Sequence, residues 1–245
     1  MGLARIARRC MSRRTSGSAA GVALLLTALS CARPALPVTT VSASACATAD
    51  VNATDTAGLL PYVHCQQLHS LTVRSGAAVD FTVLASLTAI SGDLRIGPSV
   101  GITEISLPSL QSVGGTLRVA GNTIAAGLYT NKLQRVGSLE IVDNSTLATL
   151  ALSALEAVTG DATIARNGDL GTLLAVRWAV AGGVFRLQAC RSLEFVELDP
   201  KFTAANVQIS DIPKLDWLAI PGAPVKPVQE RPAGEGASSP GDPAF

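Results

Sequence analysis

Histidine, aromatic residues and long hydrophobic runs are scarce in this chain. It contains two histidines among 245 residues, and Phe, Trp and Tyr together make up 4%. His64 and His69 are five residues apart and have no third ligand beside them, so no metal site is expected. The hydrophobic run from Ala19 to Leu29 has 11 residues, too few to cross a bilayer as a helix. The sequence therefore predicts no metal, no cofactor and no transmembrane helix.

The first 30 residues have the pattern of an export signal. They contain five arginines and no acidic residue, and the run Ala19–Leu29 follows this basic part. Residues 1–30 are therefore predicted to be a signal peptide. Its removal would leave 14 basic and 18 acidic residues, a net charge of about −4. A mildly acidic protein lacks the basic stripe that nucleic-acid binding requires, so no nucleic-acid partner is expected.

Cys31 leaves two modes of export open. Ala28 and Ser30 are small residues at the positions that an ordinary signal peptidase recognises. The segment Leu29-Ser30-Cys31 also resembles a bacterial lipobox, whose cysteine carries several acyl chains that hold the protein on a membrane. The sequence thus predicts an exported protein, either secreted or a lipoprotein of the outer membrane and cell surface. Cys31 is the candidate lipidation site, and lipid would be the only membrane contact.

Two segments of low complexity flank one domain. Residues 31–45 are small, contain proline and carry one charge, which is typical of a flexible tether. Residues 221–245 are rich in Pro, Gly and Ser and have little to bury, so they are predicted to be disordered. They also lack the hydrophobic tail of a GPI signal. Residues 46–220 remain as a single folded domain with a substantial core.

The domain consists of repeats of nearly constant length. Seven short segments recur at intervals of 22 or 23 residues, centred near Val73, Ile96, Val119, Ile141, Ile164, Leu187 and Ile209. Apolar and polar residues alternate within each segment, which is typical of a short strand with one buried face. A fixed period in this range indicates stacked coils that bury their apolar sides against one another. The predicted fold is all-β: a right-handed parallel β-helix, or solenoid, of about 6–7 coils.

Two further residue types recur in the same register. Glycines stand four residues before the strand centres, where a tight corner needs either a positive φ or close backbone approach: Gly92, Gly115, Gly137, Gly160 and Gly183. Asn122, Asn144 and Asn167 stand three residues after the centres, and an inward amide there would satisfy backbone groups at the corner. Cys190 occupies the next position of this column, so we expect a buried structural thiol rather than a reactive one.

The pattern in LQSVGGTLRVAGNTI and LEAVTGDATIARNGDL resembles the receptor L domain over residues 46–220. This is the leucine-rich, single-stranded right-handed β-helix of the insulin- and EGF-receptor ectodomains, which also occurs in bacterial surface lipoproteins. Leucine-rich repeats share the Leu-x-Leu-x-x-Asn/Cys core, so a leucine-rich-repeat adhesion protein is the alternative. The resemblance implies a disulfide between Cys46 and Cys65, and an exported solenoid can use such a bond to cap its first coil.

In the receptor family the outer face of the main sheet helps to bind the hormone. The matching outward positions form a candidate binding strip for a protein or glycan at the cell surface: Thr72, Arg95, Arg118, Glu140, Thr163, Arg186 and Gln208, with Arg74 and Gln188 alongside. The alternative is that these side chains only keep the sheet solvated. An enzyme acting on polysaccharides is not expected, because Asp93 and Asp161 are three coils, about 14 Å, apart and clustered acids are absent.

Overall fold

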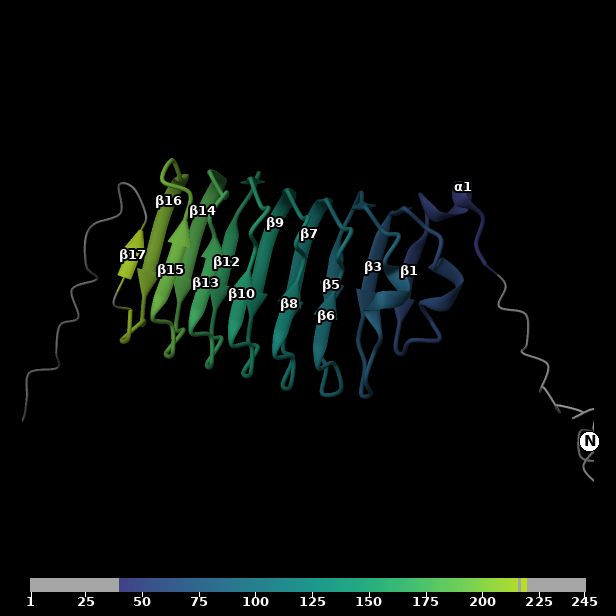
Figure 1. Ribbon diagram of the computed structural model, residues 1–245, viewed down its shortest axis with the longest axis horizontal. Coiled ribbons are helices and arrows are strands. Elements are labelled where there is room, and N and C mark those ends of the chain that lie inside the picture. Colours follow the sequence, from purple (N-terminus) through teal and green to yellow (C-terminus); the bar gives the residue numbers. More distant parts are fainter. Residues whose placement is uncertain (1–39, 216, 220–245) are drawn as a thin grey trace, which may run out of the picture. The chain divides into compact units, whose positions relative to one another are not determined.

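The computed structural model describes residues 40–215 and 217–219. These residues form a parallel β-solenoid of about seven turns, which confirms the predicted fold class (Figure 1). Helical structure within the described part is limited to α1 (Ala43–Cys46) and the 3-10 turns η1 (Leu60–Tyr62) and η2 (Phe81–Leu84), and no helix there is long and apolar enough to cross a membrane. The predicted signal peptide, Cys31 and the tail 221–245 lie outside the described residues.

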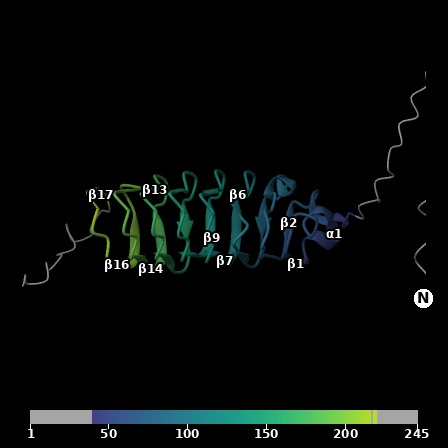
Figure 2. The ribbon, with the colours of Figure 1, turned by 90° about the horizontal axis from the view of Figure 1, so that it is seen from below.

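The strands belong to two parallel sheets, which lie on opposite sides of the coils in Figure 2. The larger sheet contains β1 (Asp50–Ala53), β2 (Gln67–Leu68), β3 (Ser70–Val73), β4 (Ala89–Ile90), β5 (Leu94–Ile96), β7 (Ser112–Ala120), β9 (Arg135–Val142), β11 (Ala157–Val158), β12 (Ala162–Ala165), β14 (Val180–Gln188) and β16 (Thr203–Ser210). The smaller one contains β6 (Glu104–Ser106), β8 (Gly127–Tyr129), β10 (Thr149–Ala151), β13 (Thr172–Ala175), β15 (Phe195–Leu198) and β17 (Trp217–Ala219).

Equivalent residues of successive coils lie directly beside one another in the larger sheet. Ile96 pairs with Val73 on one side and Val119 on the other, and Ile164 pairs with Ile141 and Leu187 in the same way. All of these side chains are at most 1% exposed, so they form a continuous apolar column through the core. Burying each of them stabilises the fold by about 1.5–3 kcal/mol relative to exposure.

The smaller sheet was not foreseen as a sheet, because the repeat pattern predicts only one strand per coil. Its strands are three or four residues long and follow the corner after the core strands from β5 to β16. In β6, β8, β10, β13 and β15 the second residue is buried, as the alternation of a half-buried strand requires: Ile105, Leu128, Leu150, Leu173 and Val196. These short strands close the coil on its second side, so the turns from β5 onward bury apolar side chains from both sheets. In the first two described coils η1 and η2 stand at this place.

The glycine column marks places where backbones approach closely. None of its five members has a positive φ. A Cβ on Gly137 would overlap the carbonyl oxygen of Gly114, and one on Gly115 would overlap the carboxylate of Asp93. β7 also carries one residue more than β9 between the pairs Val113–Val136 and Thr116–Ser138, a bulge that accounts for the shorter, 22-residue repeat.

The first coil is closed by the predicted disulfide. Cys46 of α1 is bonded to Cys65, their Cα atoms are 5.6 Å apart, and both side chains are buried against the core. The bond confirms the pairing implied by the resemblance, and it indicates an oxidising, extracytoplasmic environment. Residues 43–45, assigned to the tether from the sequence, belong to helix α1, so the folded unit begins before Cys46.

An aromatic cluster fills the coils near the other end of the described solenoid. Trp178, Phe185 and Phe202 are each at most 2% exposed and pack edge to face, with ring centroids 5.3–5.6 Å apart. The indole N–H of Trp178 donates to the carbonyl oxygen of Val180 at 2.9 Å. Trp178 and Phe202 make the same backbone turn bond as Leu155 in an earlier coil, and Phe185 aligns with Ala162, so larger side chains replace smaller ones at repeat positions. Sequence analysis did not identify the cluster, because the repeat does not specify how these rings pack.

Candidate functional site

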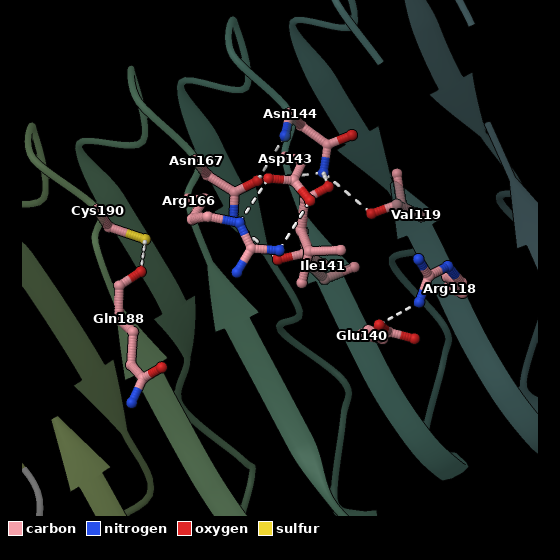
Figure 3. Close-up of polar contacts among 11 residues, drawn as sticks. Arg118, Val119, Glu140, Ile141, Asp143, Asn144, Arg166, Asn167, Gln188 and Cys190 are labelled. Atoms are coloured by element: carbon pink, nitrogen blue, oxygen red, sulfur yellow. Dashed lines mark hydrogen bonds and ion pairs between the residues drawn. The ribbon is translucent and has the colours of Figure 1, made fainter. Parts of the chain in front are cut away.

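The asparagines of the repeat form a hydrogen-bonded file inside the solenoid, next to the polar strip. Nδ2 of Asn122 donates to Oδ1 of Asn144 at 2.9 Å. Nδ2 of Asn144 donates to Oδ1 of Asn167 at 3.1 Å, and Figure 3 shows these two side chains. Each amide also binds backbone: Nδ2 of Asn144 donates to the carbonyl oxygen of Val119, and Nδ2 of Asn167 to that of Ile141. All three side chains are at most 1% exposed. The file therefore satisfies backbone groups at the corners of the coils that it links, and it is closed to solvent.

The column continues beyond the asparagines with smaller residues. Cys190 is a free, buried cysteine whose thiol donates to the carbonyl oxygen of Gln188 at 3.4 Å. Burial raises the pKa of the Cys190 thiol, which keeps it protonated and unreactive. On the N-terminal side of the asparagines, Ser99 occupies the corner position. Its Oγ accepts from the N–H groups of Gly101 and Ile102 and donates to the carbonyl oxygen of Ser75. Sequence analysis missed the two serines because a hydroxyl gives no distinctive repeat signal.

The residue directly before this column has a left-handed backbone conformation in five successive coils. The set consists of Gly121, Asp143, Arg166, Ala189 and Asp211, with φ between 53° and 68°. Four of them are not glycine, and each pays a cost in conformational energy of about 1–2 kcal/mol. The conformation turns the chain sharply, so that the residue after it lies in the interior column.

Asp143 and Arg166 form a two-point ion pair between neighbouring coils. Nε of Arg166 lies 2.6 Å from Oδ1 of Asp143, and Nη2 lies 2.8 Å from Oδ2 (Figure 3). These hydrogen bonds hold the pKa of Asp143 below its ordinary value. Sequence analysis did not identify this pair, because its geometry depends on the left-handed backbone at both positions.

The predicted polar strip is one continuous column on the larger sheet. The register aligns Thr72 with Arg95, Arg95 with Arg118, Arg118 with Glu140, Glu140 with Thr163, Thr163 with Arg186, and Arg186 with Gln208. Arg74 follows β3 directly, and Gln188 lies at the end of β14, aligned with Ala165. The structure therefore brings the predicted site residues together on one face.

Neighbouring side chains hold the arginines of the strip in place. Nη1 of Arg118 contacts Oε1 of Glu140 (Figure 3), and Nη2 of Arg95 lies 2.7 Å from Oδ2 of Asp93. Nε of Arg186 donates to Oε1 of Gln208 at 2.9 Å. The side chains of Arg95 and Arg118 are still 51% and 43% exposed. Such exposed pairs contribute about 0–1 kcal/mol, so they orient the guanidinium groups and leave them accessible.

Asp93 and Asp161, the acids weighed as catalytic candidates, have structural partners. Oδ1 of Asp93 accepts the N–H of Thr116 at 2.8 Å, and Oδ1 of Asp161 accepts the N–H of Val184 at the same distance. Both acceptors face the glycine bulge of the next coil, where the extra residue disrupts the strand pairing. The Thr116 hydrogen bond lowers the pKa of Asp93, with a smaller effect from Arg95. Each carboxylate thus accepts a backbone N–H beside a bulge and has a structural role.

Metal-binding side chains are dispersed over residues 40–215: no three of His, Cys, Asp and Glu lie close enough to hold an ion. His69 instead hydrogen-bonds through Nδ1 to Oγ of Ser91 at 3.0 Å. Comparison of the chain with protein-family models, curated proteins and solved structures gives no match. The fold and the site define a disulfide-capped parallel β-solenoid with a polar, arginine-containing outer face.

Proposed function

We propose that this protein is a non-catalytic surface module of the cell envelope or of the secreted fraction, and that the polar strip binds a protein or glycan partner. The alignment of strip residues from Thr72 to Gln208 across successive strands carries this proposal. Parallel strands are about 4.8 Å apart, so the side chains form a closely spaced row on a rigid surface. A row that is already ordered loses little entropy when it binds a partner.

Arginine gives the strip its capacity for recognition. Arg95, Arg118 and Arg186 each present a planar fork of donors that suits carboxylates, phosphates and sulfates. Arginine is also one of the residues that dominate binding energy at protein interfaces. The in-sheet partners Glu140 and Gln208 keep these side chains extended along the face instead of folded into solvent.

We assign the fold to the receptor L-domain type rather than to leucine-rich-repeat adhesion proteins. The support is the second strand in six successive coils, because a leucine-rich repeat typically pairs its strand with a helix or 3-10 segment. The first two described coils have the 3-10 turns η1 and η2 at this place. In the described residues that place is taken by the strands β6, β8, β10, β13, β15 and β17. The buried asparagine file and the disulfide ahead of the second coil agree with the same assignment.

Export is part of the proposal. The disulfide supports an extracytoplasmic location, and residues 1–30 would act as the signal peptide. Cys31 would carry the lipid in an outer-membrane or cell-surface lipoprotein, and would lack it in a secreted protein. Metabolic labelling with a fatty-acid analogue separates these forms: label present in the natural chain and lost in Cys31→Ala establishes the lipoprotein, whereas an unlabelled natural chain establishes secretion.

The strip is tested by replacing its arginines together. The variant Arg95→Ala/Arg118→Ala/Arg186→Ala is compared with Arg135→Ala/Arg177→Ala/Arg191→Ala, which removes the same charge outside the strip. Each protein is immobilised, a partner is captured from envelope extracts, and the partner is identified. Loss of capture only in the strip variant, with unchanged circular dichroism, supports the proposal. Equal capture by both variants contradicts it.

A further inference from the structure

The polar strip borders a hollow where three of its arginines converge. The hollow has a volume of about 270 Å³, and Arg74, Arg95 and Arg118 form its cationic wall. Gly97 and Gly121, both with positive φ, form part of the wall without side chains. A second hollow beside it shares Arg74 and Gly121 and adds the exposed side chain of Val100. Together they offer a charged pocket with an apolar shoulder.

The guanidinium groups around the hollow keep most of their hydrogen-bonding capacity. Within the described residues the side chain of Arg74 has no hydrogen bond and no ion pair. Arg95 contacts Asp93 through Nη2, and Arg118 contacts Glu140 through Nη1. Since each guanidinium has five N–H donors, the three side chains retain free donors for an anion.

Asp143 is the acid in the wall of the hollow, and its charge is already matched. Arg166 binds both of its carboxylate oxygens, at 2.6 and 2.8 Å. The pair leaves the hollow with the positive charge of Arg74, Arg95 and Arg118, of which the last two are each balanced by one acid at the side. An anion that enters would be attracted most strongly by Arg74, the arginine without a partner.

The backbone around the hollow is not available to a peptide strand. The N–H groups of Arg74, Gly97 and Gly121 donate to carbonyl oxygens of neighbouring coils, at 3.0, 2.8 and 3.1 Å. An extended peptide binds largely through free backbone groups at a sheet edge. Recognition in this hollow must therefore run through side chains, with the guanidinium forks as donors and Val100 as an apolar surface.

We propose that the hollow at Arg74, Arg95 and Arg118 binds the carboxylate of an acidic polysaccharide, such as a uronic acid. This deepens the proposed function and depends on it, because the hollow lies at one side of the polar strip. A carboxylate is planar and accepts two parallel N–H bonds from a guanidinium fork. Val100, which is 64% exposed in the adjoining hollow, can contact the apolar face of the sugar ring.

The test measures binding of oligogalacturonate to the full chain by titration calorimetry, with maltooligosaccharide as the neutral control. The key variant is Arg74→Gln, since it removes the arginine without a partner and leaves the ion pairs of the sheet intact. Arg191→Gln is the matched control, an exposed arginine outside the hollow. We expect binding of oligogalacturonate but not of maltooligosaccharide, and affinity roughly tenfold lower in Arg74→Gln and unchanged in Arg191→Gln.

Three results would overturn the inference. The first is an equal loss of oligogalacturonate affinity in Arg74→Gln and Arg191→Gln. The second is that maltooligosaccharide binds as tightly as oligogalacturonate, and the third is that a polyglutamate peptide binds more tightly than oligogalacturonate. The strip itself is judged separately by partner capture with the triple alanine variant. If the triple variant loses its partner while oligogalacturonate fails to bind the natural chain, the ligand class is wrong and the proposed function stands. If capture is unaffected, the proposed function fails.

Discussion

Asn144 and Asn167 are joined by two hydrogen bonds between neighbouring coils: Oδ1 of Asn167 accepts from the backbone N–H of Asn144 at 3.0 Å and from its Nδ2 at 3.1 Å. The two hydrogens of Asn144 Nδ2 are shared among Oδ1 of Asn167 and the carbonyl oxygens of Val119 and Val142, each carbonyl oxygen lying 3.0 Å from the nitrogen. One side chain thus links three coils. Because it is buried, its removal would leave several backbone groups without a partner.

Asn144→Ala is therefore expected to lower the free energy of unfolding by about 3 kcal/mol or more. Asn122→Ala should lower the free energy of unfolding by less, because Oδ1 of Asn122 has no hydrogen-bond partner among the described residues. Urea denaturation measures both, with Asn52→Ala, an exposed asparagine, as the control that stays within about 0.5 kcal/mol of the natural chain. A similar small change for all three variants would show that the file does not stabilise the fold.

Gly115→Ala should be destabilising because the added methyl group would meet Asp93 Oδ1 and the backbone of Gly92. Such overpacking typically costs about 1–3 kcal/mol. Gly76→Ala is the matched control, since a Cβ there has no atom within 4 Å, and it should be neutral or stabilising by up to about 1 kcal/mol. Thermal melts compare the two. Equal melting temperatures would contradict the close approach of backbones at the bulge.

The disulfide between Cys46 and Cys65 closes a sequence separation of 19 residues. The chain-entropy relation gives a stabilisation of about 3 kcal/mol for a loop of this size. The double variant Cys46→Ser/Cys65→Ser, and the natural chain in reductant, should both lose about that amount in urea titrations. The double variant itself should be insensitive to reductant. Unchanged stability on reduction would mean that the first coil is held by packing alone.

Stability should fall in acid through Asp143. Its hydrogen bonds to Arg166 lower its pKa in the folded state below the reference value of 3.8. A lowered pKa contributes stability that is present above the unfolded value and is lost as the pH falls through the folded value. Asp93, whose pKa is lowered mainly by the N–H of Thr116, acts in the same direction.

The measurement is the free energy of unfolding as a function of pH below 3.8, for the natural chain and for Asp143→Asn. The variant should be less stable at neutral pH and show a shallower decline in acid. Asp169→Asn, at an acid for which no side-chain hydrogen bond or ion pair is found in the described residues, is the control. Parallel curves for all three proteins would contradict a role for the Asp143–Arg166 pair.

The parts of the molecule that follow the repeat could be predicted from sequence. The 22–23-residue period gives the in-register core column through Ile96, Ile141 and Ile164, because stacking forces equivalent residues to adjoin. The outward column from Thr72 to Gln208 follows from the same alternation. Whether that column binds a partner does not follow from the repeat, since a solvated sheet face would show the same polarity.

Features that break the repeat could not be predicted in this way. Trp178 and Phe202 depart from the repeat in residue type, since Leu155 makes the same backbone turn bond in an earlier coil. Their edge-to-face contacts with Phe185 follow only from the three-dimensional packing. The left-handed conformation of Asp143 and Arg166 is imposed by the corner, against the ordinary preference of both residues. The hollow at Arg74 depends on how three long side chains lie, which a periodic pattern does not specify.

Distances between spin labels test the stacked register most directly. Labels at Thr72 and Thr163 are separated by four strand spacings, and labels at Thr72 and Gln208 by six. The background is a chain in which Cys10, Cys31 and Cys190 are replaced by alanine. At about 4.8 Å per strand, pulsed electron resonance should give Cα separations near 19 Å and 29 Å, a ratio of about 2:3. Distances that do not increase with the number of coils would contradict the stacked solenoid and, with it, the continuous polar strip.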